Sequence, residues 1–261
     1  RIGTSNSVQL VTGGTIEIEF ESDAVAVATL TGIVATTPDG QEIVLGDGAT
    51  LDFAGEQDFG PATATFVTRQ AKVGHQASMD WAVASVGSRL HRSRIENLLE
   101  GQGASVSQVE IGFGDRSQLF DLTSYTRHLG EDGTSDLLSK GVFSDKARGY
   151  IKGLIDIPYS GRGTDSFLGE FSMLLQRTAR SVTIPSLEID QPDCRRAMHS
   201  SSVGPIDETQ IFYLMSRGLS EEEAVEMVVN GFLEPITKEL PIEYAVELNK
   251  LITLEIEGSL G

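Results

Sequence analysis

Short stretches in which apolar and polar residues alternate dominate the first two thirds of the chain. In T-I-E-I-E-F at residues 15–20, Ile16, Ile18 and Phe20 share one face and the acidic residues share the other. A period of two is typical of a β-strand with one buried and one solvated face. We expect further strands, separated by turn signals such as P-D-G and G-D-G, at residues 24–30, 43–45, 50–53, 62–67, 82–86, 107–113, 118–122, 151–157 and 182–189.

Helical periodicity is clear only after Asp207. This residue is a suitable N-cap, Gln210 follows as in a capping box, and Gly218 stands where a C-terminal glycine is expected. A second helix begins at Ser220, whose hydroxyl can cap the amide of Glu223, and we expect Gly231 to end it. A third helix, with an apolar stripe, is predicted to open at Pro241.

Many strands followed by a few helices indicate a fold in which the two classes are segregated along the chain. We find no exact repeat of 20–30 residues, and the predicted strands are irregularly spaced. Periodicity alone therefore leaves a sandwich, a barrel and a solenoid open.

Charge and cysteine content restrict the classes of partner. The formal net charge of −18 would repel a phosphate backbone, so we expect no nucleic-acid partner. No apolar run reaches the roughly 18 residues that a membrane helix needs. One cysteine cannot form an internal disulfide. These features predict a cytoplasmic protein that binds no membrane.

Cys194 and His199 are the candidate chemical groups, since a thiolate and an imidazole suit iron or zinc. We expect both in a loop, where Arg195 and Arg196 could lower the pKa of the thiol. Two other interpretations stay open at this point: a small buried Cys194 with a structural role, and a Cys–His hydrolase, which the absence of an oxyanion-type glycine motif disfavours. The other histidines are expected on the surface or in turns: His75, His91 and His128.

Several motifs in the second half carry a family resemblance. They are T-S-D-L-L-S-K-G-V at 134–142, Y-I-K-G-L-I at 150–155, P-S-L-E-I at 185–189, His199, and D-E-T-Q-I-F-Y-L-M-S-R-G at 207–218, followed by Ala224 and Phe232. From about residue 88 onward the chain resembles the SufB/SufD scaffold proteins of iron–sulfur cluster assembly.

The resemblance implies a mainly β fold with C-terminal α structure. Residues 1–200 would form a right-handed parallel β-helix whose last coil lies near 183–189, and residues 201–261 a small helical domain. It further implies a scaffold without enzymatic turnover that supports formation or transfer of a transient Fe–S cluster. His199 would lie at the contact between two scaffold subunits, with Cys194 as a second candidate ligand of the cluster.

The resemblance also implies partners. The sequence has no G-x-x-x-x-G-K-[ST] motif, so ATP hydrolysis would belong to a SufC-type ABC ATPase. We expect that ATPase to bind a surface made by Phe212, Tyr213, Met215, Arg217 and Ser220. The second subunit would be another copy of this chain or a SufB/SufD paralogue.

Two cysteine positions of the family are not retained. Ala197 stands where the D branch commonly carries a cysteine, and Ala179 where the B branch carries its core cysteine. The alternative from another class is a strand-rich solenoid or sandwich that binds carbohydrate or another small ligand. Paired acids are abundant, as at Asp115 with Asp121 or Glu131 with Asp132, and none of the pairs stands out by its spacing.

Overall fold

The computed structural model describes residues 6–7, 16–20, 25–30, 41–45, 47–59, 63–237 and 253, and the side chains of residues 45, 47–53, 63–234 and 253. In chain order its elements are β1 (Asn6–Ser7), β2 (Ile16–Phe20), β3 (Val25–Leu30), β4 (Gln41–Leu45), β5 (Thr50–Phe59), β6 (Ala64–Val73), β7 (Ser78–Gly87), β8 (Leu90–Leu99), β9 (Ser105–Gly114), β10 (Leu119–His128), β11 (Thr134–Phe143), β12 (Arg148–Ile157), β13 (Asp165–Leu174), β14 (Arg180–Ile189), β15 (Arg196–Pro205), α1 (Glu208–Ser216) and α2 (Glu221–Thr237).

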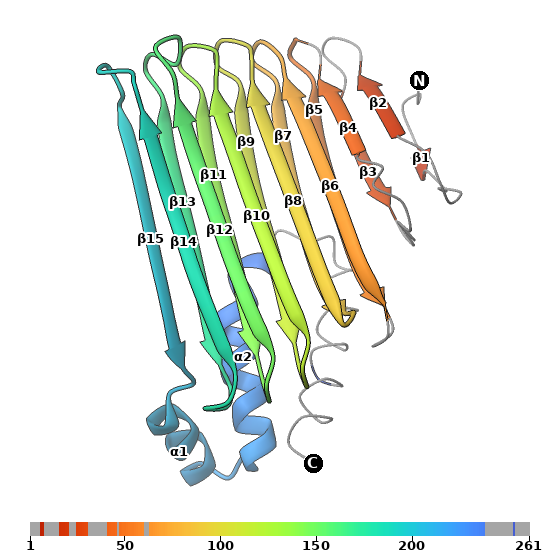
Figure 1. The fold of residues 1–261 in the computed structure, drawn as a ribbon, viewed down its shortest axis with the longest axis vertical. Coiled ribbons are helices and arrows are strands. Elements are labelled where there is room, and N and C mark those ends of the chain that lie inside the picture. Colours follow the sequence, from red (N-terminus) through yellow and green to blue (C-terminus); the bar gives the residue numbers. More distant parts are fainter. Residues whose placement is uncertain are drawn as a thin grey trace.

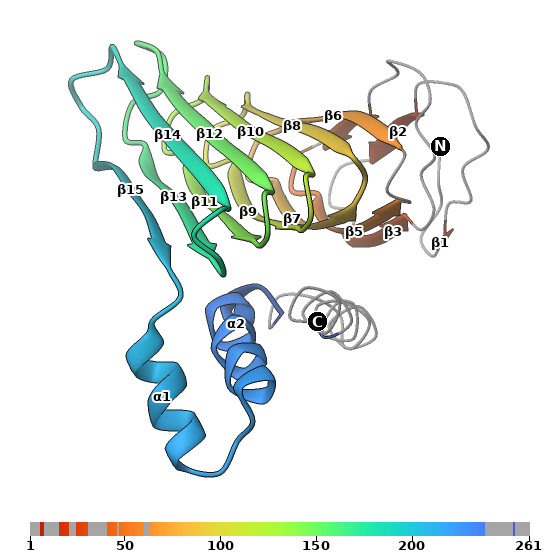
Figure 2. The same cartoon turned by 60° about the horizontal axis from the view of Figure 1, so that its bottom comes forward.

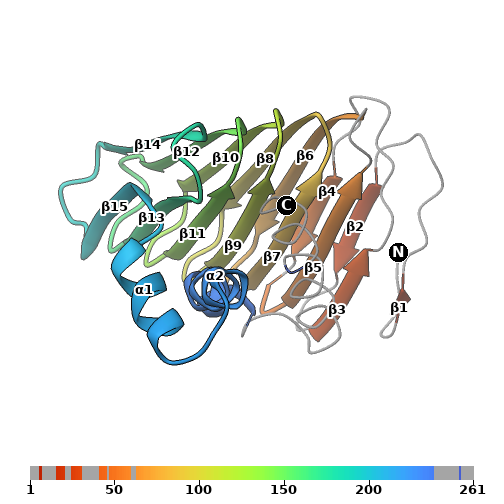
Figure 3. The same cartoon turned by 90° about the horizontal axis from the view of Figure 1, so that it is seen from below.

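The strands form two parallel sheets that face one another (Figures 1 and 3). Odd-numbered strands make the 8-stranded sheet A, and even-numbered strands from β2 to β14 make the 7-stranded sheet B. The chain therefore crosses to the other sheet after every strand and returns to pair with the strand two before it. Six consecutive strands of sheet A start at 50, 78, 105, 134, 165 and 196, so one coil takes about 30 residues. The prediction of a parallel β-helix followed by helices is confirmed.

From the sequence we inferred that the strands are irregularly spaced, and this is wrong for this part of the chain. The repeat is one of backbone conformation and not of residue type. At one corner of each coil a residue has positive φ: Gly48, Gln76, Gly103, Asp132 and Gly163. Their amides donate to carbonyls of the next coil, as in Gly103 to Glu131 at 2.9 Å. The stacked corners impose a repeat although the residue type changes between coils.

The pattern of buried residues differs between the two sheets, because α2 covers part of the outer face of sheet A. In β10 and β12 every second residue is buried, because the outer face of sheet B meets solvent. In β7, β9 and β11 the second half of each strand is buried on both faces. There α2 packs on the outer face of sheet A, as Figure 3 shows, with Val225, Val229 and Leu233 against residues such as Val109 and Ile111.

The N-caps predicted at Asp207 and Ser220 are confirmed, while the Gln210 side chain lines the groove between α1 and α2. The Asp207 carboxylate accepts from Thr209 N at 2.8 Å, and Ser220 and Glu223 cap one another's amides at 2.7 and 3.2 Å. Gly218 takes φ 102° after α1. No helix in the described part of the chain is both long and apolar enough to cross a membrane.

The prediction that Gly231 ends the second helix is wrong. α2 continues to Thr237, because Phe232 and Leu233 still pack against sheet A and hold the next turn in place. The helix predicted to open at Pro241 lies outside the described residues.

Candidate functional site

The solenoid ends at the C-terminal side in two uncovered strands, β14 and β15. Each is the last strand of its sheet, so one edge of each carries N–H and C=O groups that pair with no described strand. Apolar side chains on these strands stay 40–49% exposed: Ile189 and Val203 on the inner face, and Val182, Ile184 and Met198 on the outer faces. A solenoid core that stops without a polar cap leaves apolar surface for another element to bury.

His199 lies on β15 at this end and not in a loop, which corrects our expectation. The β-helix also has one strand more than the last coil predicted at 183–189. β15 pairs in register with β13, which places His199 beside Leu168 and Ser201 beside Glu170. Leu168 is fully buried in the core, and Ala197 packs against the same cluster. By alternation along the strand, His199 faces the solenoid interior at its mouth, where it remains exposed.

Cys194 lies in the turn before β15, and its thiol is not activated. Its Sγ donates to the Thr164 carbonyl at 3.4 Å, and the side chain is half-buried against the core. Burial raises the pKa of the thiol above its usual value, and Asp165 and Asp193 act in the same direction, while the Arg196 backbone opposes them. The prediction of a lowered pKa is therefore wrong.

The two arginines after Cys194 have partners of their own. Arg195 pairs with Asp132, and Arg196 pairs with Asp165 at 2.6 Å. Both guanidinium groups are thereby directed to the neighbouring coil. Within the described ranges, no three or more His, Cys, Asp or Glu side chains come close enough together to hold a metal ion. His199 is therefore an exposed candidate ligand, and a metal ion bound to it would need further ligands.

Two histidines expected on the surface are buried inside the solenoid. His91 is 1% and His128 0% exposed. Burial lowers the pKa of His91 to about 3, assisted by Arg69, and that of His128 to about 4. Alternation along the strands places both histidines on the inner face. In the sequence, however, a polar residue at an inner position interrupts the apolar pattern, so the pattern does not reveal that the residue is buried. His75 is exposed, as expected.

The interior also holds a chain of hydrogen bonds between the sheets. Trp81 Nε1 donates to Asn97 Oδ1 at 2.8 Å, and Asn97 Nδ2 donates to Gln108 Oε1 and Thr126 Oγ1 at 3.0 and 3.1 Å. Gln108 in turn donates to Ser124. A buried side-chain amide that makes all its hydrogen bonds rigidifies the core. If one of its hydrogen-bond partners is removed, the fold is destabilised. The sequence motifs did not point to these residues.

The five residues of the expected partner surface lie together on α1 and the start of α2. Phe212 is 72%, Tyr213 55% and Met215 42% exposed, and Arg217 and Ser220 are exposed as well. The Arg217 guanidinium stacks 5.1 Å from the centre of the Tyr213 ring. In Figure 2, α1 projects beyond the end of β15, away from the solenoid. Within the described part of the chain, this side of α1 is exposed.

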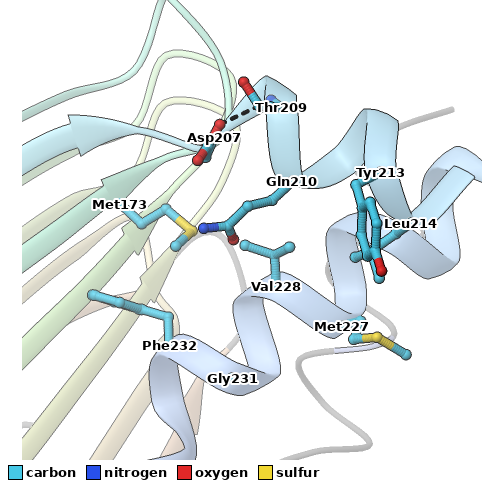
Figure 4. Close-up of a pocket in the computed structure, with 10 residues that line it drawn as sticks. All are labelled: Met173, Asp207, Thr209, Gln210, Tyr213, Leu214, Met227, Val228, Gly231 and Phe232. Atoms are coloured by element: carbon cyan, nitrogen blue, oxygen red, sulfur yellow. Dashed lines mark hydrogen bonds between the residues drawn. The ribbon is translucent and has the colours of Figure 1, made fainter.

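Beside it, a groove of about 640 Å³ runs between α1, α2 and β13. Figure 4 shows Met173 and Phe232 at one end and Tyr213 and Met227 at the other, with Gln210 between them. Its lining is mostly apolar. The groove extends the exposed aromatic surface of α1 toward the solenoid.

One buried lysine fixes α2 to the solenoid. The Lys140 ammonium on β11 donates to the Phe232 carbonyl and lies 4.6 Å from the centre of the Phe232 ring. Burial lowers the pKa of Lys140 below its usual value. A cation placed over an aromatic ring and on a helix carbonyl ties the two elements together.

The acids proposed for a carbohydrate site do not form an open pair. Asp121 is bound by Arg92 and Lys152, Asp132 by Arg195, and Asp115 by Arg116. Glycosidase chemistry needs two carboxylates facing each other across a substrate. These ion pairs leave that alternative without a supporting observation.

Comparison with known proteins agrees with the family resemblance of the sequence motifs. Residues 2–232 match the protein family described as SUF system FeS cluster assembly, SufBD core domain. An iron-sulfur cluster assembly SufBD family protein of Staphylococcus saprophyticus is 35% identical over 220 residues, and those of Staphylococcus epidermidis and Staphylococcus aureus are each 34% identical. These alignments cover 84% of this chain and 47% of each relative, so the chain spans about half the length of the curated relatives it matches.

Proposed function

Because the chain belongs to the SufBD family of the SUF system, we propose that it is a scaffold component of iron–sulfur cluster assembly. The cluster is the cargo of this process, and the chain performs no turnover chemistry of its own. The observation that carries the proposal is the exposed His199 on the terminal strand of an uncovered solenoid end. We place the work in the cytoplasm, where thiols stay reduced.

The uncovered end is where a second scaffold chain would bind. A partner strand added to β15 or β14 would pair the free backbone edge and cover the apolar side chains of that end. The partner is a second copy of this chain or a SufB/SufD paralogue. Light scattering after gel filtration tests this: we expect a dimer, and Val203→Lys, which puts a charge at the uncovered end, should shift it toward monomer. A Lys substitution at the exposed Thr68 on the outer face of sheet B is the matched control.

At such a contact, His199 would meet donors from the partner. An imidazole is a suitable ligand for iron, and the remaining ligands would come from the other chain or from sulfide. Cys194 is a less direct candidate, because its thiol is held by Thr164 and its pKa is raised. Retention of the metal by one histidine alone would be weak, as a transient cargo site requires.

Anaerobic reconstitution with iron and sulfide, followed by visible absorption and Mössbauer spectra, tests the cluster role. We expect His199→Ala to lose the cluster signal and Cys194→Ala to keep most of it. An unchanged signal in His199→Ala would refute the assignment of His199. If the wild type forms no cluster with its partners present, the scaffold proposal itself fails.

We further propose that a SufC-type ABC ATPase binds the exposed surface of α1 and the start of α2. Aromatic and arginine side chains are common anchors in protein interfaces. Phe212, Tyr213 and Arg217 are all exposed, and Arg217 stacks on Tyr213. Arg217→Glu should abolish copurification of the ATPase. Arg148→Glu, at an exposed position on the outer face of sheet B, is the control, and equal binding by both variants would contradict this surface.

A further inference from the structure

Glu170 on β13 is a buried carboxylate for which the fold so far gives no reason. Its side chain is fully buried, and neither carboxylate oxygen accepts a well-formed hydrogen bond among the described residues, although the Ile184 backbone amide acts on the carboxyl group. A buried polar group without a partner is destabilising, and natural structures contain few of them. Such a group calls for an explanation in terms of a ligand or a proton.

The fold makes room for this carboxylate. Opposite Glu170, sheet B carries Gly153, and a Cβ built there would lie 2.7 Å from Glu170 Oε1. Any larger residue at position 153 would push the carboxyl group aside. The absence of a side chain at Gly153 therefore leaves room for the carboxylate.

The position of Glu170 links it to the uncovered end. It pairs with Ser201 on β15, and His199 lies two residues before Ser201 on the same inner face. Neighbouring strands lie about 4.8 Å apart, and diagonal neighbours about 7–8 Å, which two long side chains can bridge. Only β15 separates Glu170 from the mouth of the solenoid. The register thus places the two residues in diagonal positions on the inner face of the last two strands of sheet A.

We propose that Glu170 and His199 together bind a ferrous ion at the mouth of the solenoid. Carboxylate and imidazole are both ligands that divalent iron accepts, and the ion supplies the positive charge that the buried carboxylate lacks. Binding replaces the carboxyl proton, which leaves to solvent, by the metal, and no electron is transferred. The inference rests on the proposed role of this end of the molecule in cluster assembly and names iron entry as its first step.

Electrostatics agree with this exchange. Burial raises the pKa of Glu170 to about 8, and the Ile184 backbone amide lowers it by less. Burial thus disfavours an isolated charge at this position. A cation at the mouth would reverse this preference.

Cobalt(II) is the probe, since its visible bands report the ligand set and the ion is stable in air. We expect the wild-type protein, in its native oligomer, to bind Co²⁺ with bands of nitrogen and oxygen ligation. Loss of a direct ligand should weaken binding by at least the roughly 10- to 100-fold that loss of an outer-shell partner costs. Glu170→Gln and His199→Ala should each show this loss, measured by titration calorimetry and absorption.

Glu110→Gln is the matched control. Glu110 is also a fully buried glutamate of sheet A and lies in the same row of paired positions as Glu170, two strands further from the mouth. Its variant should bind Co²⁺ as the wild type does. If Glu170→Gln does not fold by circular dichroism, Glu170→Asp replaces it, and the shorter side chain should weaken binding in the same direction.

The outcomes separate this inference from the proposed function. Wild-type affinity in folded Glu170→Gln, or no Co²⁺ binding by the wild type, overturns the site. If Co²⁺ binding is normal in Glu170→Gln but His199→Ala loses the reconstituted cluster, the scaffold function stands and the Glu170 site falls. If Glu170→Gln loses Co²⁺ yet wild-type protein builds no cluster with its partners, the metal site stands and the assembly role falls.

Discussion

The buried histidines predict a specific loss of stability in acid. His128 lies inside the solenoid, with Nε2 3.0 Å from Ser135 Oγ and Nδ1 without a partner in the described part of the structure. Its pKa falls from 6.5 to about 4 on burial. The unfolded chain therefore takes up a proton at a higher pH than the folded one does, and stability is lost as the pH falls from about 6.5 to about 4.

The size of the loss follows from the shift. One pKa unit corresponds to about 1.4 kcal/mol, so His128 withdraws about 2.5–3 kcal/mol from the free energy of unfolding between pH 7.5 and 4.5. His91, whose pKa falls to about 3, withdraws a similar amount. Together they remove a large part of the 5–15 kcal/mol or so that typically stabilises a domain.

The stability of the wild-type protein alone cannot isolate the contribution of the two histidines, because other buried groups titrate in the same pH range. Burial raises the pKa of Glu110 to about 6 and that of Glu170 to about 8, so these carboxyls favour the folded state increasingly as the pH falls. The test is the difference in unfolding free energy between wild type and His128→Gln, measured by urea titration at both pH values. Glutamine keeps a polar partner for Ser135 but cannot titrate.

We expect the variant to be less stable than wild type at pH 7.5 and the gap to close by about 2.5 kcal/mol at pH 4.5. Thr68→Gln, which changes an exposed residue without a titratable group, should show a gap that does not change with pH. A His128→Gln gap constant to within about 0.5 kcal/mol would refute the reasoning, since the proton would then not distinguish the folded from the unfolded chain.

Three further predictions concern packing. Asn97→Ala removes the shared partner of the buried amide network and should cost about 2–4 kcal/mol of unfolding free energy in urea titrations; a cost below 1 kcal/mol would contradict the network. Gly149→Ala puts a Cβ 2.2 Å from the Phe143 ring and should cost about 1–3 kcal/mol, with Phe143→Leu recovering part of it; full stability of the single variant would refute the clash. Lys140→Met frees the Phe232 carbonyl, so hydrogen exchange should speed up in α2 and not in β9; equal rates in both elements would argue against the link.

Local patterns predicted the elements that follow simple periodicity. Residues 15–20 and 151–157 alternate cleanly, and both are strands. The caps at Asp207 and Ser220 depend on side-chain chemistry within a few residues, and the structure forms both. Local signals of this kind need no knowledge of the rest of the fold.

β15 shows why other parts escaped prediction. Its sequence, R-A-M-H-S-S-S-V-G-P, lacks alternation because no further coil covers its inner face. A strand whose inner side chains stay exposed has no reason to be apolar there. His91, His128 and Glu170 were missed for a related reason. In the sequence, a polar residue on a buried inner face cannot be distinguished from a polar residue on the surface. The site at His199 was therefore reached from family motifs and not from periodicity.

The stacked positive-φ corners have a consequence for how this molecule can change in length. Each corner amide donates to the coil above it, and each strand pairs with the one a full coil away. A one-residue deletion inside a strand would turn every later side chain of that strand to the opposite face. Removing or duplicating about 30 residues, one complete coil, would keep corners and faces aligned. Loss or gain of whole coils is thus the change in length that this core tolerates, and a protein shortened by one coil should keep its uncovered end intact.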